Sequence, residues 1–249
     1  MTQVAPLRPN ADKDIVRILL IGDEPNLLRT LRRNLLGRGY DVLIALDDVE
    51  AYETSESQAP DLFVLNLDFT SVNVDGLQIC AELRRKSQSP IIVLSAVGSE
   101  GIKIRAFDLG ADDYVVMPFG MDEFLARVRS TLRRWSAYKA GVVNHAHVIL
   151  SGDLVINTDS RQVTVRGDVV RLTPHEYSVL LYLAQHAGKV VTHRELLKAV
   201  WGDQYGDERE YLRVFVSQVR RKIEEDPLRP SYILTEPGVG YRFAQGQSS

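Results

Sequence analysis

The stretch Leu62-Phe63-Val64-Leu65-Asn66-Leu67-Asp68 decides the fold. Its first four residues form an unbroken apolar run, which is typical of a strand buried on both faces of a sheet. Strands of this kind occur in parallel sheets that helices cover on both sides. Ligands of such sheets bind beyond the carboxyl ends of the strands, which is where Asn66 and Asp68 lie.

The sequence on either side of this stretch alternates in the same way between apolar runs and helical patterns. It predicts four further strands, at 18–21, 40–45, 91–95 and 114–116. Between them it predicts helices, at 26–38, from 48 onward, and at 75–85, 101–109 and 121–134. This alternation predicts a five-stranded, doubly wound parallel α/β domain over residues 16–134, after a loose tail at 1–15.

Residues 135–147 break the alternation and are predicted to be a linker. Short alternating strands follow, at 148–150, 154–157, 162–166 and 169–172. Thr173-Pro174-His175-Glu176 and Thr192-His193-Arg194-Glu195 are capping boxes that predict two helix starts. A third helix at 208–225 and a hairpin of strands at 232–235 and 241–243 complete an α+β winged-helix domain over 148–244.

Composition limits the classes of protein that fit this chain. Its 249 residues are enough for two domains, each with a core of its own. Cys80 is the single cysteine, so an intrachain disulfide and any metal cluster that needs two cysteines are excluded. No apolar run approaches the roughly 18 residues of a membrane span, and the polar N-terminus does not resemble a signal peptide. We therefore expect a cytoplasmic protein that does not enter a membrane.

The predicted third helix carries the strongest signal for nucleic-acid binding. Between Arg209 and Lys222 the chain has five basic residues and one acidic residue, whereas the whole chain has a net charge of −3. Arginine can bridge phosphates or read guanine edges in a major groove. An isolated basic helix is more often a solvated face. The helix pair before this one and the glycine-rich hairpin after it favour DNA binding.

Three motifs of the second half resemble the effector domain of the OmpR/PhoB family of response regulators. They are Leu172-Thr173-Pro174-His175-Glu176-Tyr177, Val219-Arg220-Arg221-Lys222-Ile223 and Gly238-Val239-Gly240-Tyr241-Arg242-Phe243. The resemblance implies that the third helix reads DNA. It matches Arg213, Ser217 and Gln218 to positions facing bases, Arg209, Arg220 and Arg221 to positions near phosphates, and Arg242 to the wing.

The first half resembles the receiver domain of the same family through Gly110-Ala111-Asp112-Asp113-Tyr114 and Pro118-Phe119. Within the family, Pro118–Phe124 and Tyr211-Leu212-Arg213 are most similar to the KdpE subgroup, which regulates potassium-uptake genes. The family's phosphoryl chemistry requires two acids and Mg²⁺, an aspartate, a hydroxyl and a lysine. The matching positions here are Gly22 and Asp23 (with Glu24 next to them), Asn66, Ser95 and Met117, with Tyr114 as the aromatic switch partner.

The position of the phosphoacceptor depends on the direction of counting. Counting forward from Pro60-Asp61 places it at Asn66, whose amide cannot form an acyl phosphate. Counting back from Asp75-Gly76 places it at Asp68, which would require a longer or bulged third strand. We favour Asn66 at the strand tip. With one acid and the lysine missing, we expect weak or absent Mg²⁺ binding, no other cofactor and no appreciable phosphorylation.

Members of this family dimerise through the fourth helix, fifth strand and fifth helix of the receiver. Six charged residues resemble this interface. They would form three ion pairs across two protomers: Lys103 with Glu123, Asp113 with Arg127, and Asp112 with Arg134. As an isolated surface pair, each would contribute under about 1 kcal/mol to the stability of the dimer. Their joint presence predicts a homodimer that forms without phosphate. The resemblance further implies direct-repeat sites in double-stranded DNA, contact with RNA polymerase, and a sensor histidine kinase if phosphorylation persists.

Three alternatives remain open from the sequence. A kinase could still phosphorylate Asp68. The receiver could instead be a docking module for a ligand or partner protein, with DNA binding secondary. A phosphatase using Asp23, Glu24, Asp68 and Ser95 is the weakest, so we predict a transcription regulator rather than an enzyme.

Overall fold

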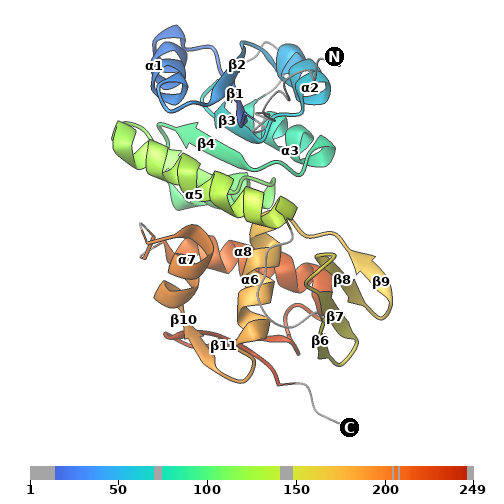
Figure 1. Ribbon diagram of the computed structural model, residues 1–249. Coiled ribbons are helices and arrows are strands. Elements are labelled where there is room, and N and C mark those ends of the chain that lie inside the picture. The colour runs from blue at the N-terminus through green and yellow to red at the C-terminus, as the bar shows by residue number, and fades with distance from the viewer. Residues whose placement is uncertain (1–14, 70–74, 141–147, 204, 207, 246–249) are drawn as a thin grey trace, which may run out of the picture.

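The computed structural model describes residues 15–69, 75–140, 148–203, 205–206 and 208–245, and it shows two domains stacked one on the other (Figure 1). The described part of the chain begins at Ile15 in the first domain and ends at Gln245 in the second. The predicted tail at 1–15 lies outside the described residues except for Ile15, as does 141–147 of the predicted linker. No helix in the described ranges is long and apolar enough to cross a membrane.

The first domain is a five-stranded parallel sheet in the order β2-β1-β3-β4-β5. Its strands are β1 (Arg17–Ile21), β2 (Asp41–Ala45), β3 (Leu62–Asn66), β4 (Ile91–Ser95) and β5 (Asp113–Val116). Every residue of β3 and β4 is buried, which explains their unbroken apolar sequences. The predicted doubly wound α/β domain is confirmed.

Helices cover both faces of this sheet. The helices α1 (Pro25–Leu36) and α5 (Met121–Ala140) share one apolar cluster with β1, β3 and β4. The opposite face is covered by α2 (Asp48–Gln58), α3 (Gly76–Lys86) and α4 (Glu100–Asp108). Helix α5 runs six residues beyond its predicted end at Arg134. Trp135, which the sequence places in the linker, is only 7% exposed and keeps the helix packed.

The second domain begins with an antiparallel sheet of β6 (Val148–Ser151), β7 (Leu154–Asn157), β8 (Gln162–Val165) and β9 (Asp168–Val170). Three helices follow: α6 (Pro174–Gln185), α7 (His193–Trp201) and α8 (Arg209–Ile223). The hairpin of β11 (Ile233–Glu236) and β12 (Gly240–Phe243) forms the wing, and the predicted winged helix is confirmed.

A third strand, β10 (Val190–Thr192), pairs with β12 and was not predicted. Gly240 makes this pairing possible, because a Cβ at that position would lie 1.9 Å from the Val191 carbonyl oxygen. The wing is therefore anchored to the segment that leads into α7.

Both predicted helix starts at threonine are observed. Thr173 caps α6 in a complete capping box, with Glu176 accepting a hydrogen bond from the Thr173 amide at 2.6 Å. Thr192 caps α7 by accepting from the Glu195 amide at 3.1 Å. The Glu195 side chain instead accepts from the Tyr182 hydroxyl at 3.2 Å, so the second box is only half formed.

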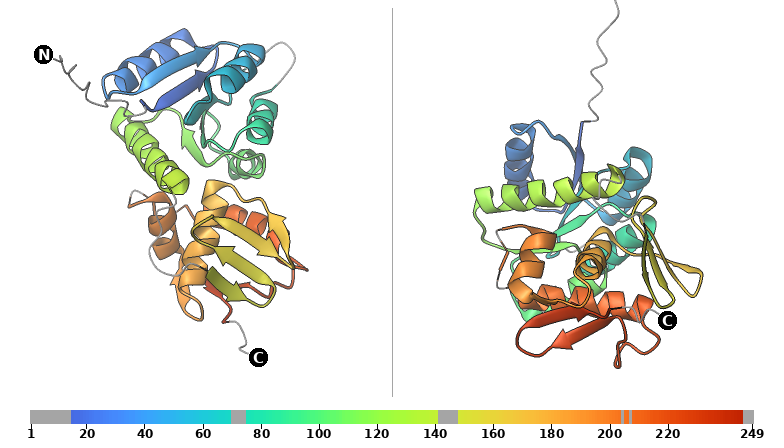
Figure 2. Two further views of the ribbon diagram at one scale, coloured as in Figure 1. Left: turned by 45° about the vertical axis from the view of Figure 1, so that its right-hand side comes forward. Right: turned by 60° about the horizontal axis from the view of Figure 1, so that its bottom comes forward.

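The two domains pack directly on each other, with α4, β5 and α5 of the first facing α6, α7 and α8 of the second (Figure 2). Buried residues of both domains belong to one apolar cluster, which runs from Phe107 and Tyr114 to Trp201, Tyr211 and Phe215. We call this contact surface the interdomain interface. It covers the face of the first domain that was predicted to form a dimer.

Candidate functional site

The end of β3 holds Asn66, as the forward count along the chain predicts. Its amide is only 5% exposed, and its Oδ1 accepts a hydrogen bond from the Asp68 amide at 3.2 Å. A Cβ built on Gly22 would lie 3.0 Å from the Asn66 Cβ, so the glycine leaves room for this side chain. The strand tip therefore presents an amide, with an aspartate two residues beyond it.

The Asp68 carboxylate turns toward β4. Its Oδ1 accepts a hydrogen bond from the Ser95 hydroxyl at 2.7 Å, and its Oδ2 accepts from the Ala96 amide at 2.5 Å. Ser95 is fully buried, whereas Asp68 lies at the exposed mouth of the pocket. Both donors at the end of β4 are thus engaged by a carboxylate of the same chain.

The other positions of the pocket supply little charge. Met117 is packed against the apolar cluster of α1 and α5, where the family's lysine would bring a cation. Tyr114 is buried, and its hydroxyl donates to the Val97 carbonyl at 2.6 Å. Burial raises the pKa of Tyr114. The phenol therefore stays neutral and acts as a hydrogen-bond donor at neutral pH.

The residues present do not fit a magnesium ion. Mg²⁺ requires several oxygen ligands in near-octahedral geometry. Asp23 and Glu24 are exposed, and Asp68 is directed to Ser95 and Ala96. Within the described ranges, no group of three or more His, Cys, Asp or Glu side chains is arranged to hold a metal.

The interdomain interface places α8 against α4. The ring of Phe107 lies 4.4 Å from that of Tyr211 and 5.6 Å from that of Phe215, centroid to centroid. Gln218 donates from Nε2 to the Phe107 carbonyl at 2.8 Å, and Tyr211 donates to the Tyr114 carbonyl at 2.8 Å. The predicted DNA-reading helix is thus held to the receiver along one side.

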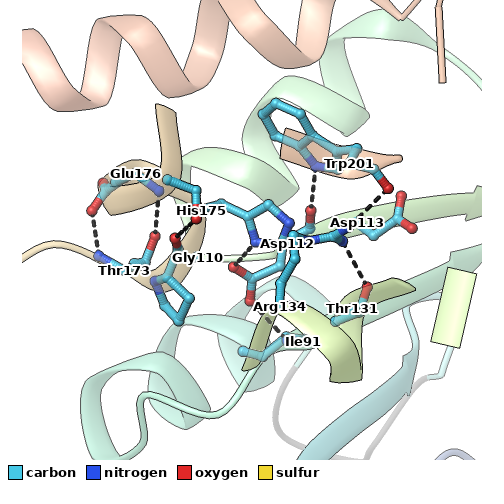
Figure 3. A network of polar contacts seen from close by, with 12 residues as sticks. Ile91, Gly110, Asp112, Asp113, Thr131, Arg134, Thr173, His175, Glu176 and Trp201 are labelled. Atoms are coloured by element: carbon cyan, nitrogen blue, oxygen red, sulfur yellow. Dashed lines mark hydrogen bonds and ion pairs between the residues drawn. The ribbon is translucent and has the colours of Figure 1, made fainter. Parts of the chain in front are cut away.

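Asp112 is the polar centre of this interface (Figure 3). Its carboxylate accepts from Arg84 Nη2 at 2.5 Å, His175 Nδ1 at 2.8 Å and the Ile91 amide at 2.9 Å. Burial alone would raise the pKa of this carboxyl, but Arg84 and then His175 outweigh that effect and lower it. Burial lowers the pKa of His175. A neutral imidazole therefore bridges the domains as a donor to an ionised carboxylate.

A second buried cluster surrounds Asp113. Its carboxylate accepts from Arg127 Nη1 at 3.2 Å and also from the Tyr205 hydroxyl. The Arg127 guanidinium lies 4.6 Å from the Tyr205 ring centroid, a cation–π contact. Burial and then the charge of Asp113 raise the pKa of Tyr205 well above its ordinary value. The ion pair predicted between two protomers thus forms inside one chain.

The remaining residues of the predicted dimer face also serve contacts within the chain. Lys103 lies 4.0 Å from Glu210 on α8, and Glu123 pairs with Arg127 at 2.9 Å. Arg134 donates to the Trp201 carbonyl at 2.8 Å and to Thr131 at 3.2 Å (Figure 3). Burial lowers the pKa of Arg134 to about 10. In this arrangement, all six predicted dimer residues make contacts within the chain, and only Glu123 among them is exposed.

The opposite side of α8 carries the predicted DNA contacts. Arg209 and Arg213 are exposed, and Ser217 is half-buried beside them. Burial and then the charges of these two arginines lower the pKa of His193 at the start of α7. The surface where α7 begins and α8 begins is therefore electropositive, as a phosphate-binding surface requires.

Gln218 is not on this side of the helix. It lies five residues beyond Arg213, about 140° around the axis, and is bonded to Phe107. Arg221 is exposed, 3.6 Å from Asp108 of α4. The structure therefore separates Gln218 from Arg213, with which the sequence grouped it, and places Arg221 next to the receiver.

Two of the predicted DNA-contacting arginines brace the wing. Arg220 donates from Nε to the Ile233 carbonyl at 3.0 Å and from Nη2 to the Thr235 hydroxyl at 2.9 Å. Arg242 pairs with Glu236 across the hairpin at 2.7 Å. These contacts fix the hairpin next to α8.

Sequence reasoning missed the interdomain interface. The sequence gives no role to Trp201 or Tyr205 and gives His175 only a place in a helix start, yet all three contact Asp112 or Asp113. The available signal was a cluster of large aromatic residues at helix ends of the second domain. No pattern in the sequence indicated that these residues face another domain.

Comparison with known proteins matches both domains. Residues 18–129 match the model of the response regulator receiver domain, and residues 167–243 match that of the C-terminal domain of transcriptional regulatory proteins. The transcriptional regulatory protein KdpE of Mycobacterium tuberculosis is 43% identical over 226 residues, which cover 91% of this chain and 98% of the relative.

Solved structures also align over most of the chain. A mutant of RitR aligns with a TM-score of 0.72 at 24% identity, covering 93% of this chain and 100% of its own, which shows a shared fold. DrrB, an OmpR/PhoB homologue of Thermotoga maritima, aligns over the same shares at 29% identity with a TM-score of 0.49.

Proposed function

The chain belongs to the OmpR/PhoB family of response regulators as a KdpE-like transcriptional regulator with a receiver and a DNA-binding domain, and from this premise we propose that it binds specific double-stranded DNA without being phosphorylated. The observation that carries the DNA-binding part is the exposed basic side of α8. The observation that carries phosphorylation independence is the amide of Asn66 at the end of β3.

The position of α8 supports sequence-specific reading. A helix that follows a helix pair and precedes a wing can enter a major groove and place side chains on base edges. Arg213 lies at the centre of the exposed side, and Arg209 extends the same side toward the N-terminus of α8. In this proposal Arg213 contacts bases and Arg209 contacts a phosphate. In the closed arrangement Gln218 contacts the receiver, so it can reach DNA only after the domains separate.

Phosphorylation independence is supported by the contents of the pocket. Asn66 offers no carboxylate at the strand tip, and Met117 offers no cation for a transferred phosphoryl group. Asp68 is the remaining candidate acceptor, but both of its oxygens already accept hydrogen bonds from β4 and the residue after it. The positioning and charge neutralisation that phosphoryl transfer requires are therefore missing.

We also propose that the active species on DNA is a homodimer at paired half-sites. The family's dimer face is the surface that α6, α7 and α8 cover in this structure. Dimerisation through it would require the domains to separate and would exchange buried contacts inside one chain for similar contacts between chains. Free protein in the closed arrangement is then a monomer, and binding to adjacent half-sites on DNA would favour the open form.

Replacing Arg213 with alanine is expected to relax base preference by about 1–3 kcal/mol, because a bidentate contact to a base edge is lost. The test is footprinting of genomic DNA with the wild type, followed by affinity measurements on the recovered site and on single-base variants of it. The wild type should protect two adjacent half-sites and sediment on that DNA as two chains.

Arg229→Ala is the matched control, since Arg229 is an exposed arginine that pairs with Asp226 beyond the end of α8. It should leave both base preference and affinity unchanged. An Arg213→Ala variant with unaltered base preference would show that α8 is rotated relative to the proposal. Absence of any footprint for the wild type would refute DNA binding itself.

A further inference from the structure

The pocket at the end of β4 holds two hydrogen-bond donors that point to one place. They are the hydroxyl of Ser95 and the backbone amide of Ala96, 2.7 Å and 2.5 Å from the two oxygens of Asp68. A hydroxyl and an amide that converge in this way form a small oxyanion site. Ser95 cannot relocate freely, because it is fully buried and its Oγ also accepts from the Val97 amide at 3.0 Å.

The residues around this donor pair match a tethered carboxylate better than a free dianion. Met117 and Gly22 bring neither a cation nor a metal ligand to the pocket. A free phosphate would need such partners, whereas a carboxylate carries one charge and is held by its own chain. Tethering also avoids much of the entropy that a free ligand would lose on binding.

Hydrogen bonds connect this donor pair with the interdomain interface. The carbonyl of Val97 accepts from the Tyr114 hydroxyl at 2.6 Å. The carbonyl of Tyr114 accepts from the hydroxyl of Tyr211 on α8 at 2.8 Å. Asp68 therefore fixes the loop after β4, and this loop in turn fixes the tyrosine against which α8 docks.

We propose that Asp68 is a built-in anion that occupies the oxyanion site of Ser95 and Ala96 and thereby holds residues 95–97 and Tyr114 in the conformation to which α8 binds. This inference rests on the proposed phosphorylation independence, since a receiver that accepted phosphate would need the same two donors for it. Removing the carboxylate should convert the pocket into a site for a small external oxyanion.

Amide resonances of the full-length ¹⁵N-labelled protein test this inference without DNA or a phosphodonor. In Asp68→Ala, the Ala96 amide should exchange with solvent about tenfold faster or more, because a charge-assisted hydrogen bond is lost. Adding sodium acetate, with chloride as the ionic-strength control, should restore its protection. Acetate should also shift the Ala96 resonance in the variant and leave it unmoved in the wild type.

Two further variants serve as controls. Asp23→Ala removes an exposed carboxylate at the same edge of the sheet and should change neither exchange nor anion response. Asp68→Asn keeps the shape of the side chain and one acceptor oxygen, so it should expose only one of the two donors. It also keeps the experiment informative if the alanine variant folds poorly.

The proposal is overturned if Ala96 exchanges equally fast in Asp68→Ala and in the wild type. It is also overturned if acetate fails to restore protection, or if acetate shifts the wild-type resonance as strongly as that of the variant. None of these results bears on DNA affinity, so the failure of this inference is distinguishable from failure of the proposed function.

Discussion

Asp112→Ala is expected to lower the free energy of unfolding by about 3–5 kcal/mol, because it leaves a buried arginine without its counter-ion. Arg84 is 12% exposed and Asp112 is 1% exposed, so water cannot easily replace the lost carboxylate. The His175 ring and the Ile91 amide lose an acceptor in the same step. The measurement is urea denaturation followed by the fluorescence of Trp135 and Trp201, which are buried on α5 and α7.

The pH dependence of this effect follows from the direction of two pKa shifts. The pKa of Asp112 is lowered from its ordinary value of 3.8, so its contribution is complete above that pH and is lost as the pH falls further. Burial lowers the pKa of His175 from 6.5, so stability also falls below that pH, where unfolded chains bind the proton more readily. In Asp112→Ala, the loss of stability that comes from protonating Asp112 at low pH should therefore be absent.

Asp108→Ala is the control for the loss of a carboxylate at the interdomain interface. Asp108 is 37% exposed on its side chain and lies 3.6 Å from the exposed Arg221, so its removal should cost at most about 1 kcal/mol. Equal unfolding midpoints for Asp112→Ala and the wild type would show that the Asp112 carboxylate is not the buried partner of Arg84 in solution.

Trp201→Ala is expected to cost about 3–5 kcal/mol, which is typical of a large aromatic residue removed from a core. Its side chain is fully buried, with the His175 ring 5.2 Å away and the Phe215 ring 5.1 Å away, centroid to centroid. Its indole also donates to the Asp112 carbonyl at 3.3 Å. The loss should loosen both α7 and the receiver contact. Circular dichroism in urea and hydrogen exchange of α8 measure the two effects separately.

Leu228→Ala is the apolar control, since Leu228 is 92% exposed beyond α8 and its truncation should change stability by less than about 0.5 kcal/mol. If Trp201→Ala unfolds the second domain but leaves exchange in α4 unchanged, then Trp201 serves only the core of its own domain. The closed arrangement would then lack the support that the structure assigns to it.

The receiver fold was predictable because its sheet is buried on both faces. Such strands consist of unbroken apolar runs, as in 62–65 and 91–94, and the alternation of these runs with helical patterns predicts a parallel sheet. The position of Asn66 at the end of β3 followed from the same run. The side-chain direction of Asp68 was not predictable, because it depends on donors that another strand supplies.

Local chemistry explains which parts of the second domain were found from the sequence. Thr173 and Thr192 mark helix starts through contacts within four residues, so both starts were predicted. The strand β10 was missed, because three residues carry little periodic signal and its only strand partner, among the described residues, is the distant β12. The hairpin of the wing was predicted from the sequence, but its pairing with β10 was not.

The use of the charged residues on α4, β5 and α5 could not be predicted from the sequence. The sequence around Asp113 and Arg127 is the same whether the two residues pair within one chain or between two chains. Pairing within one chain depends on Tyr205 and Trp201. Both are far away in the sequence and reach the β5 residues only because the two domains pack together. The six residues predicted for a dimer remain a prediction for the open form.

The most direct test of the central claim is DNA affinity before and after treatment with acetyl phosphate and Mg²⁺, with the intact mass measured in parallel. We expect full binding of the footprinted site by the untreated protein, no added phosphoryl group and no change in Kd. Asn66→Asp alone should behave in the same way, because Met117 and Gly22 still leave the pocket without partners for a phosphoryl group. A stable acyl phosphate on Asp68, accompanied by tighter DNA binding, would contradict the account.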